Sequence, residues 1–188
     1  MSTGYQIKDQ EGAYYLTLQV VCWIDIFSRK TYRDIVIENF RYCQKNKGLV
    51  IFAYVIMSNH IHVLVQSEKA NLSSIIRDFK SFTSKVNLEN IENGNESRKE
   101  WMLSCFKNKA KEHERNRYYQ FWAQENHAEQ IYTDKFVKQK LEYIHMNPVR
   151  AGIVKIPEDY IYSSASNYAG LESILDVEIL STKWITYK

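Results

Sequence analysis

His60 and His62 are the residues of this chain best suited to bind a metal ion. They lie in segment 53–65, where two apolar stretches rich in β-branched residues flank a short polar break, a pattern typical of a β-hairpin. Residues two apart in a strand point to the same face, so the two imidazoles would project side by side while Ile61 faces a core. Two imidazoles held on one rigid strand form half of a divalent-metal site.

A second pair of candidate residues, Tyr143 and Asn147, lies in segment 141–152. Residues four apart on a helix share a face, one turn from each other. A tyrosine hydroxyl can act as a covalent nucleophile when a base or a metal activates it. The amide oxygen of Asn147 can serve as a third ligand beside the histidines, and such a set suits Mg²⁺ or Mn²⁺. A metal so placed would act as a Lewis acid on a phosphoryl oxygen and orient it for in-line attack.

Strands and helices that alternate along the chain must bring these two pairs together. A hydrophobic period of two predicts strands, and a period near 3.6 predicts helices. Gly48 is expected to stop the first helix and Asn71 to cap the second, whereas Pro148 should end the last because proline disfavours helical geometry at the preceding residue. The expected strands are 14–26, 49–57, 60–66 and 121–124, and the expected helices are 32–46, 71–89, 99–109 and one that begins at Thr133 or Asp134.

The order of these elements predicts an α+β fold, with a ferredoxin-like antiparallel sheet and helices packed on one face. We expect residues 1–188 to form a single domain. Segment 92–120 is polar and highly charged, which favours an exposed insertion, and 150–188 is expected to be a C-terminal extension.

The composition is that of an ordinary globular protein, with 45% hydrophobic and 25% charged residues and a formal net charge of +3. Three cysteines that are far apart indicate reduced thiols, not a disulfide framework or a zinc site. No apolar run is long enough to span a bilayer, so no membrane partner is expected, and the polar N-terminal segment lacks the apolar core of a signal peptide. A cytoplasmic location is therefore expected.

Taken together, the two motifs resemble the single-tyrosine HUH transposases. The resemblance extends from about Tyr14 to Ala169 and rests mainly on segments 57–62 (MSNHIH) and 143–152 (YIHMNPVRAG). Further similar residues precede the tyrosine helix in segment 121–124 and follow it in segment 162–168. An asparagine at position 147 is similar to the REP-associated tyrosine transposases, whereas their insertion-sequence relatives usually carry glutamine there.

This resemblance implies a ferredoxin-like fold that cleaves single-stranded DNA next to imperfect hairpins. It implies a covalent 5′-phosphotyrosine, a free 3′-hydroxyl and a transfer of the linked strand to another end. By the same resemblance His60 and His62 are metal ligands, Asn147 is the third ligand and Tyr143 is the nucleophile. The expected cofactor is Mg²⁺ or Mn²⁺, and the expected partner is single-stranded or hairpin DNA.

Contacts with the DNA backbone are expected from basic residues near these motifs. Arg77, Lys80 and Lys85 lie on the helix that follows the histidine strand, and Arg150 follows the tyrosine motif. Such side chains hold phosphates and set the salt dependence of binding. The sequence leaves open whether the chain acts alone or as a homodimer.

Other interpretations of these residues remain open at the level of sequence. A histidine pair on a strand can be purely structural, Asn147 can simply end its helix, and His145 is expected to pack or to face solvent. The chain could be a domesticated protein that binds repeated palindromic DNA without cutting it. It could also be a metal phosphoesterase that uses water, with Tyr143 as a bystander.

Overall fold

The computed structural model describes residues 6–112 and 118–180. Parts of the charged insertion (113–117) and of the C-terminal extension (181–188) lie outside these ranges. The elements in chain order are β1 (Tyr14–Gln19), α1 (Lys30–Lys47), β2 (Leu49–Ile56), β3 (His60–Ser67), α2 (Leu72–Asn93), α3 (Lys99–Lys111), β4 (Glu129–Gln130), α4 (Asp134–Arg150) and α5 (Ala165–Tyr168), with 3-10 turns at Val21–Trp23, Ile26–Ser28 and Pro157–Asp159.

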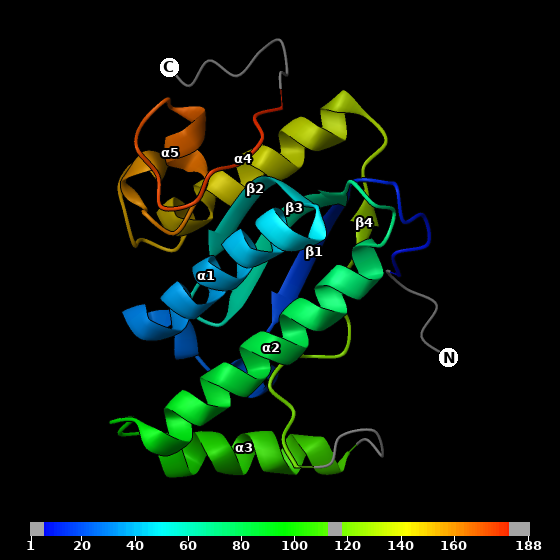
Figure 1. Cartoon of the computed structure of the whole chain (residues 1–188). Helices are drawn as coiled ribbons and strands as arrows, with labels where there is room; N and C mark the ends of the chain where they lie inside the picture. Colours follow the sequence, from blue (N-terminus) through cyan, green and yellow to red (C-terminus); the bar gives the residue numbers. More distant parts are fainter. Residues whose placement is uncertain (1–5, 113–117, 181–188) are drawn as a thin grey trace.

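The four strands form one antiparallel sheet in the order β2-β3-β1-β4 (Figure 1). β2 and β3 form the predicted hairpin, and α1 carries the chain from β1 across to β2. Gly48 ends α1 in a left-handed conformation with φ of 71°, which a residue with a Cβ adopts only at a cost. This β-α-β-β-α-β order confirms the predicted α+β fold with an antiparallel sheet.

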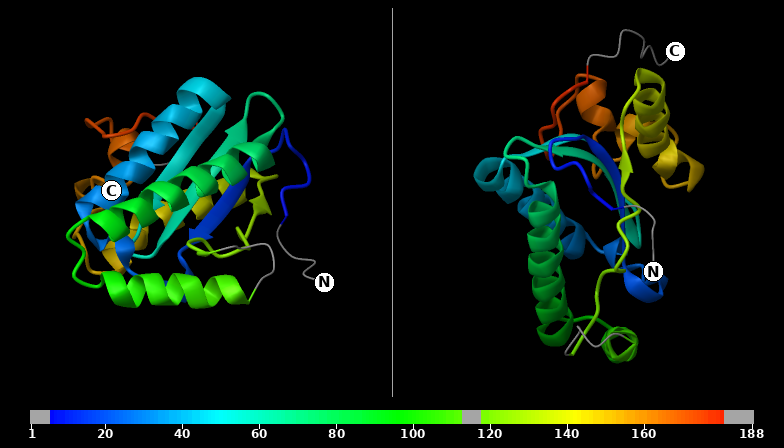
Figure 2. Two further views of the ribbon diagram at one scale, coloured as in Figure 1. Left: turned by 60° about the horizontal axis from the view of Figure 1, so that its bottom comes forward. Right: turned by 90° about the vertical axis from the view of Figure 1, so that its right-hand side faces the viewer.

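Helices cover both faces of the sheet. α1 and α2 lie on one face, where Phe40 stacks on Phe79 at 4.6 Å and lies 6.4 Å from the ring of Tyr54. The prediction of helices on one face holds for these two, whereas α4 contacts β2 and β3 from the opposite side (Figure 2). The reason is the apolar character of the sheet: every residue of β2 except Val50 is buried, so both of its faces need cover.

Two of the predicted strands differ clearly from the structure. β1 ends at Gln19, because the chain then enters two short turns rather than continuing as a strand to residue 26. Segment 121–124 makes only an isolated bridge, between Val20 and Trp122, and the edge strand is β4. Trp122 instead turns its indole into the core, where Nε1 donates to Oγ1 of Thr83 at 3.1 Å.

The end of α4 also differs, because the helix continues through Pro148 to Arg150. Proline lacks an N–H to donate to the preceding turn, yet the residues beyond it still bond back into the helix. Ala151 N–H donates to the carbonyl of Asn147, and Ile153 N–H donates to the carbonyl of Pro148, both at 2.9 Å. Pro148 therefore removes one hydrogen bond from α4 without ending the helix.

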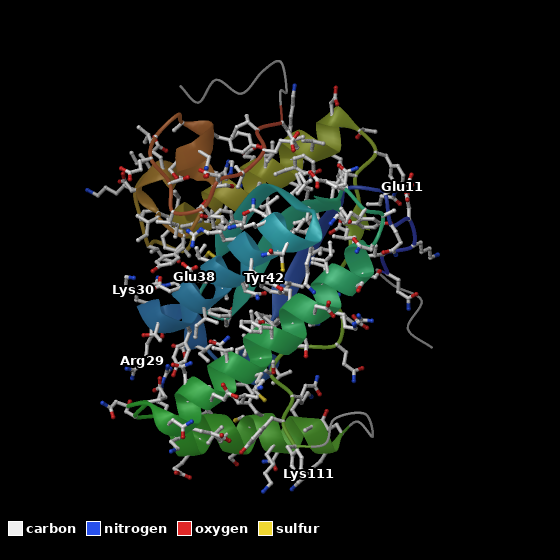
Figure 3. The ribbon with its side chains drawn as sticks, in the orientation of Figure 1. Glu11, Arg29, Lys30, Glu38, Tyr42 and Lys111 are labelled. Atoms are coloured by element: carbon white, nitrogen blue, oxygen red, sulfur yellow. The ribbon has the colours of Figure 1, made fainter. Side chains whose placement is uncertain are left out.

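The helix predicted inside the charged insertion is present as α3, but its inner side is not exposed. Met102, Phe106 and Ala110 are buried, and the Phe106 ring lies 5.3 Å from that of Phe121. α3 runs below the end of α2, and Lys111 on its last turn projects away from the sheet (Figure 3). None of the helices in the described ranges combines the length and the apolar character needed to cross a membrane.

Candidate active site

His60 and His62 share the face of β3 that is turned away from α1 and α2. On the neighbouring strand Thr17 pairs with His62 and Gln19 pairs with His60, and paired residues project to the same side. The two imidazole rings lie 4.6 Å apart between centroids, at an interplanar angle of 70°. The structure therefore brings the two histidines together as the spacing predicts.

His62 is held by two hydroxyl groups of β1. Its Nδ1 lies 2.7 Å from the Tyr15 hydroxyl and 3.0 Å from Oγ1 of Thr17. Burial, followed by the nearby His60 and Lys140, lowers the pKa of His62 to about 3. The ring is therefore neutral near pH 7, which is the form that binds a metal ion.

His60 is oriented by the residue before it. Its Nδ1 lies 2.6 Å from Oδ1 of Asn59, and an amide oxygen can only accept a hydrogen bond. The proton of the neutral His60 ring must then lie on Nδ1, which leaves the lone pair on Nε2. Burial lowers the pKa of His60 as well, so both rings are uncharged at neutral pH.

Tyr143 reaches this pair from α4, on the same side of the sheet. Thr133 begins the helix by accepting a hydrogen bond from the N–H of Phe136, and Leu141 and Ile144 anchor its inner side. The Tyr143 ring lies 5.1 Å from that of His62, and 41% of the side chain remains exposed. A single chain thus places an accessible phenol beside its own histidines.

Asn147 lies on α4 one turn beyond Tyr143, half-buried, and its carbonyl continues the helix. The described residues contain no group of three or more histidine, cysteine, aspartate or glutamate side chains that could hold a metal. A metal at the histidine pair would therefore need a ligand of another kind, such as an amide oxygen. Asn147 has the right chemistry for that position.

The hydrogen bonds of the two histidines fit metal binding. Nε2 of His62 is buried and has no hydrogen-bond partner within the described ranges, which is rare for a buried polar atom. If Nδ1 of His62 donates to one of its two hydroxyl neighbours, Nε2 presents a lone pair, as it does in His60. Histidines that bind metals usually donate their second ring N–H in this way.

Arg150 is the predicted basic residue that lies at this site. It stands seven residues after Tyr143, two helical turns along the same face, and its guanidinium carbon lies 5.7 Å from the centroid of the Tyr143 ring. Because α4 continues past Pro148, the helix carries this positive charge toward the phenol.

Arg77 and Lys85 lie elsewhere. Both are on α2, which covers the opposite face of the sheet, and both have nearby carboxylates. Arg77 lies 3.1 Å from Asp78, and Lys85 lies 3.9 Å from Glu89. The structure does not bring these two residues to the histidines, and their contact with DNA stays a prediction.

Lys80 has a structural contact that the sequence did not suggest. Its ammonium donates to the carbonyl of Ala123 and to Oδ1 of Asn126, each at 2.7 Å. Burial lowers its pKa to about 8. Lys80 therefore ties segment 123–126 to α2, and a role in DNA binding stays a prediction.

Three residues near the site were missed at the level of sequence: Tyr15, Thr17 and Lys140. Lys140 lies 4.1 Å above the ring of Tyr15 and 2.8 Å from a carboxylate oxygen of Glu129. Tyr15 and Thr17 alternate along β1, so their period of two was a signal that they share a face. Only the pairing of β1 with β3 shows that this face is the one with the histidines.

Comparisons with known proteins found one family and one similar solved structure. Residues 14–147 match the protein family described as "Transposase IS200 like". One solved structure, described as "Structure of the REP associates tyrosine transposase bound to a REP hairpin", superimposes with a TM-score of 0.63 at 19% sequence identity, over 96% of this chain and 96% of that chain. At this identity the likeness shows the fold. No curated protein matches the chain in sequence.

Proposed function

The chain belongs to the family of IS200-like transposases, and from that membership we propose that it is a metal-dependent transposase of single-stranded DNA. It would bind DNA hairpins, cleave one strand by attack of Tyr143, and rejoin ends through a 5′-phosphotyrosine. The similar solved protein is described as bound to a REP hairpin, which supports hairpin DNA as the substrate class.

The observation that carries this proposal is the approach of Tyr143 to the histidine pair. A phenol with 41% of its side chain exposed lies 5.1 Å, ring to ring, from a buried and neutral imidazole. A tyrosine with a purely structural role would be expected to bury its ring and satisfy its hydroxyl. Here the phenol stays open to a substrate beside two unprotonated imidazoles.

In the proposed step, the phenol oxygen of Tyr143 bonds to the phosphorus of a phosphodiester while the bond from phosphorus to the 3′ oxygen breaks. The phenol releases its proton to solvent water, and the departing 3′ oxygen takes up a proton from water and leaves as a hydroxyl. The phosphate stays joined to its 5′ oxygen and becomes linked to Tyr143. Attack by a 3′-hydroxyl on this link reverses the reaction or joins a new end. The nearby guanidinium of Arg150 would stabilise negative charge on the phosphate.

His60, His62 and Asn147 would hold the metal ion, Mg²⁺ or Mn²⁺. When bound, such an ion polarises a phosphoryl oxygen. The contribution of the chain is to keep both imidazoles neutral by burial and to fix their rings, through Asn59 at His60 and through Tyr15 and Thr17 at His62.

The test is covalent capture of DNA. The protein is incubated with Mn²⁺ or Mg²⁺ and a labelled library of DNA hairpins with randomised stems and single-stranded flanks, and adducts are resolved on a denaturing gel. We expect a metal-dependent adduct in the wild-type chain, and its loss in Tyr143→Phe with hairpin binding retained. The matched control is Tyr132→Phe, because Tyr132 is an exposed tyrosine just before the same helix.

An adduct that persists in Tyr143→Phe would remove that residue from its assigned role. Hairpin binding without cleavage under either metal would favour a domesticated, non-cleaving protein. Cleavage that leaves no adduct and is unchanged in Tyr143→Phe would indicate a phosphoesterase that uses water.

A further inference from the structure

A hollow of about 470 Å³ lies at the end of β1, the strand that pairs with the histidine strand β3. It is formed by the end of β1 and the turn after it, by α3, and by the segment that precedes β4. Gln19, in its wall, is the residue that pairs with His60, and the N–H of Val20 donates to the carbonyl of Asn59 at 3.0 Å. One wall of the hollow therefore belongs to the residue of β1 that lies opposite His60.

The turn that borders the hollow carries an exposed tryptophan on a strained backbone. Cys22 and Trp23 both adopt left-handed conformations, with φ of 56° and 55°, although neither is glycine. The Trp23 side chain is 69% exposed. The turn is held in place by Val21, whose N–H donates to the carbonyl of Phe121 at 2.9 Å. Strain of this kind persists where the surrounding structure enforces it, and it clusters at functional sites.

The wall of the hollow carries groups that recognise a nucleobase. Gln19 and Gln124 supply amide groups that can both donate and accept hydrogen bonds, as the edges of bases require. The positive charge of Lys109 is offset by Glu112 at 2.7 Å. An aromatic face beside amide groups matches an unpaired base.

The wall is also fixed before any ligand arrives. The N–H of Ala123 donates to the carbonyl of Gln19, and the N–H of Thr17 donates to the carbonyl of Asn126, both at 2.8 Å. Lys80 ties the same segment to α2. A preformed hollow binds without first having to order its own chain.

We propose that this hollow holds one unpaired base of the single strand whose phosphate lies at the histidine pair, and that Trp23 stacks on that base. The inference rests on the proposed function, because it takes the substrate to be single-stranded DNA. Trp23 and the hollow take no part in the proposed cleavage step. The turn that carries Trp23 lies next to the histidine pair, since Asn59 Nδ2, in the residue before His60, donates to the backbone carbonyl of Trp23 at 3.4 Å.

The test compares the binding of two labelled probes by fluorescence anisotropy: an unstructured single strand of mixed sequence, and a blunt DNA hairpin with no single-stranded flank. We expect Trp23→Ala to bind the single strand about tenfold more weakly, because stacking on an aromatic side chain contributes on the order of 1–3 kcal/mol per base. Trp23→Phe should lose less. Binding of the blunt hairpin should not change, and thermal melting should verify that both variants are folded.

Trp101→Ala is the matched control, because Trp101 is a half-exposed tryptophan of α3 that does not line the hollow. It should bind both probes as the wild-type chain does. Equal affinity of Trp23→Ala and wild type for the single strand, or no single-strand binding by the wild type, would overturn the proposal. Adduct formation by Tyr143 is scored separately: a chain that forms no adduct but loses single-strand binding in Trp23→Ala would keep the base site and lose the proposed chemistry.

Discussion

At the scale of single residues, Asn59 decides which nitrogen of His60 is available. Its amide oxygen lies 2.6 Å from Nδ1 and so fixes both the ring and the position of the proton. Groups that orient a metal-binding histidine typically contribute 10–100-fold to metal affinity. We therefore expect Asn59→Ala to bind Mn²⁺ about 10–100-fold more weakly than the wild-type chain, as measured by titration calorimetry.

The control for this variant is Ser58→Ala, because Ser58 is an exposed neighbour of Asn59 in the same turn. It should leave Mn²⁺ affinity unchanged. Wild-type affinity in Asn59→Ala would show that the amide does not orient His60.

At the same scale, the sequence predicted the candidate residues better than the residues that hold them in position. His60 with His62, and Tyr143 with Asn147, are local pairs whose spacing of two or four residues is enough to place them on one face. Tyr15 and Thr17 touch His62 only because β1 pairs with β3 in one register, and that register joins residues about 45 positions apart. No local period carries such information.

At the scale of elements, α3 is part of the hydrophobic core although its sequence is charged. Phe106 is fully buried and packs on Phe121. Truncation of a buried phenylalanine leaves a cavity and typically costs 3–5 kcal/mol. We expect Phe106→Ala to lower the free energy of unfolding by about 3–5 kcal/mol in urea denaturation.

Trp101→Ala on the same helix should cost much less, because half of that side chain is already exposed. If Phe106→Ala proved as stable as the wild-type chain, α3 would be a dispensable insertion. The sequence predicted this helix but not its burial, since three apolar residues on one side were outweighed in the composition by the surrounding charges.

The face of the sheet on which α4 packs is another feature that the sequence could not predict. Its amphipathic pattern predicts a buried side but not the face of the sheet on which that side packs. The answer lies in the sheet, where β2 is buried almost throughout and requires cover on both faces. The continuation of α4 past Pro148 likewise depends on bonds made by residues beyond the proline.

At the scale of the whole molecule, one chain contains the histidine pair and the tyrosine in contact. We expect catalysis within a single chain, so a mixture of Tyr143→Phe and His62→Ala should form no adduct. Each variant lacks one half of the site, and neither could borrow the missing half from the other. The measurement is the adduct gel described above, with equal amounts of the two proteins.

Restoration of the adduct in that mixture would mean that the tyrosine of one chain serves the histidines of another. The control is a mixture of wild type with either variant, which should form the adduct in proportion to the wild-type chain present.

The end of β1 has a consequence for the position at which DNA would be cut. The same short strand faces the histidines through Thr17 and Gln19 and then leads into the turn that displays Trp23. Gln19 is the last residue of β1, and the turn between Gln19 and Trp23 is held by hydrogen bonds of Val21 N–H and of the Trp23 carbonyl. If the base site and the cleavage centre are both as proposed, this turn fixes the distance between them. The position of the cut, counted in nucleotides from the captured base, would then be set by the turn.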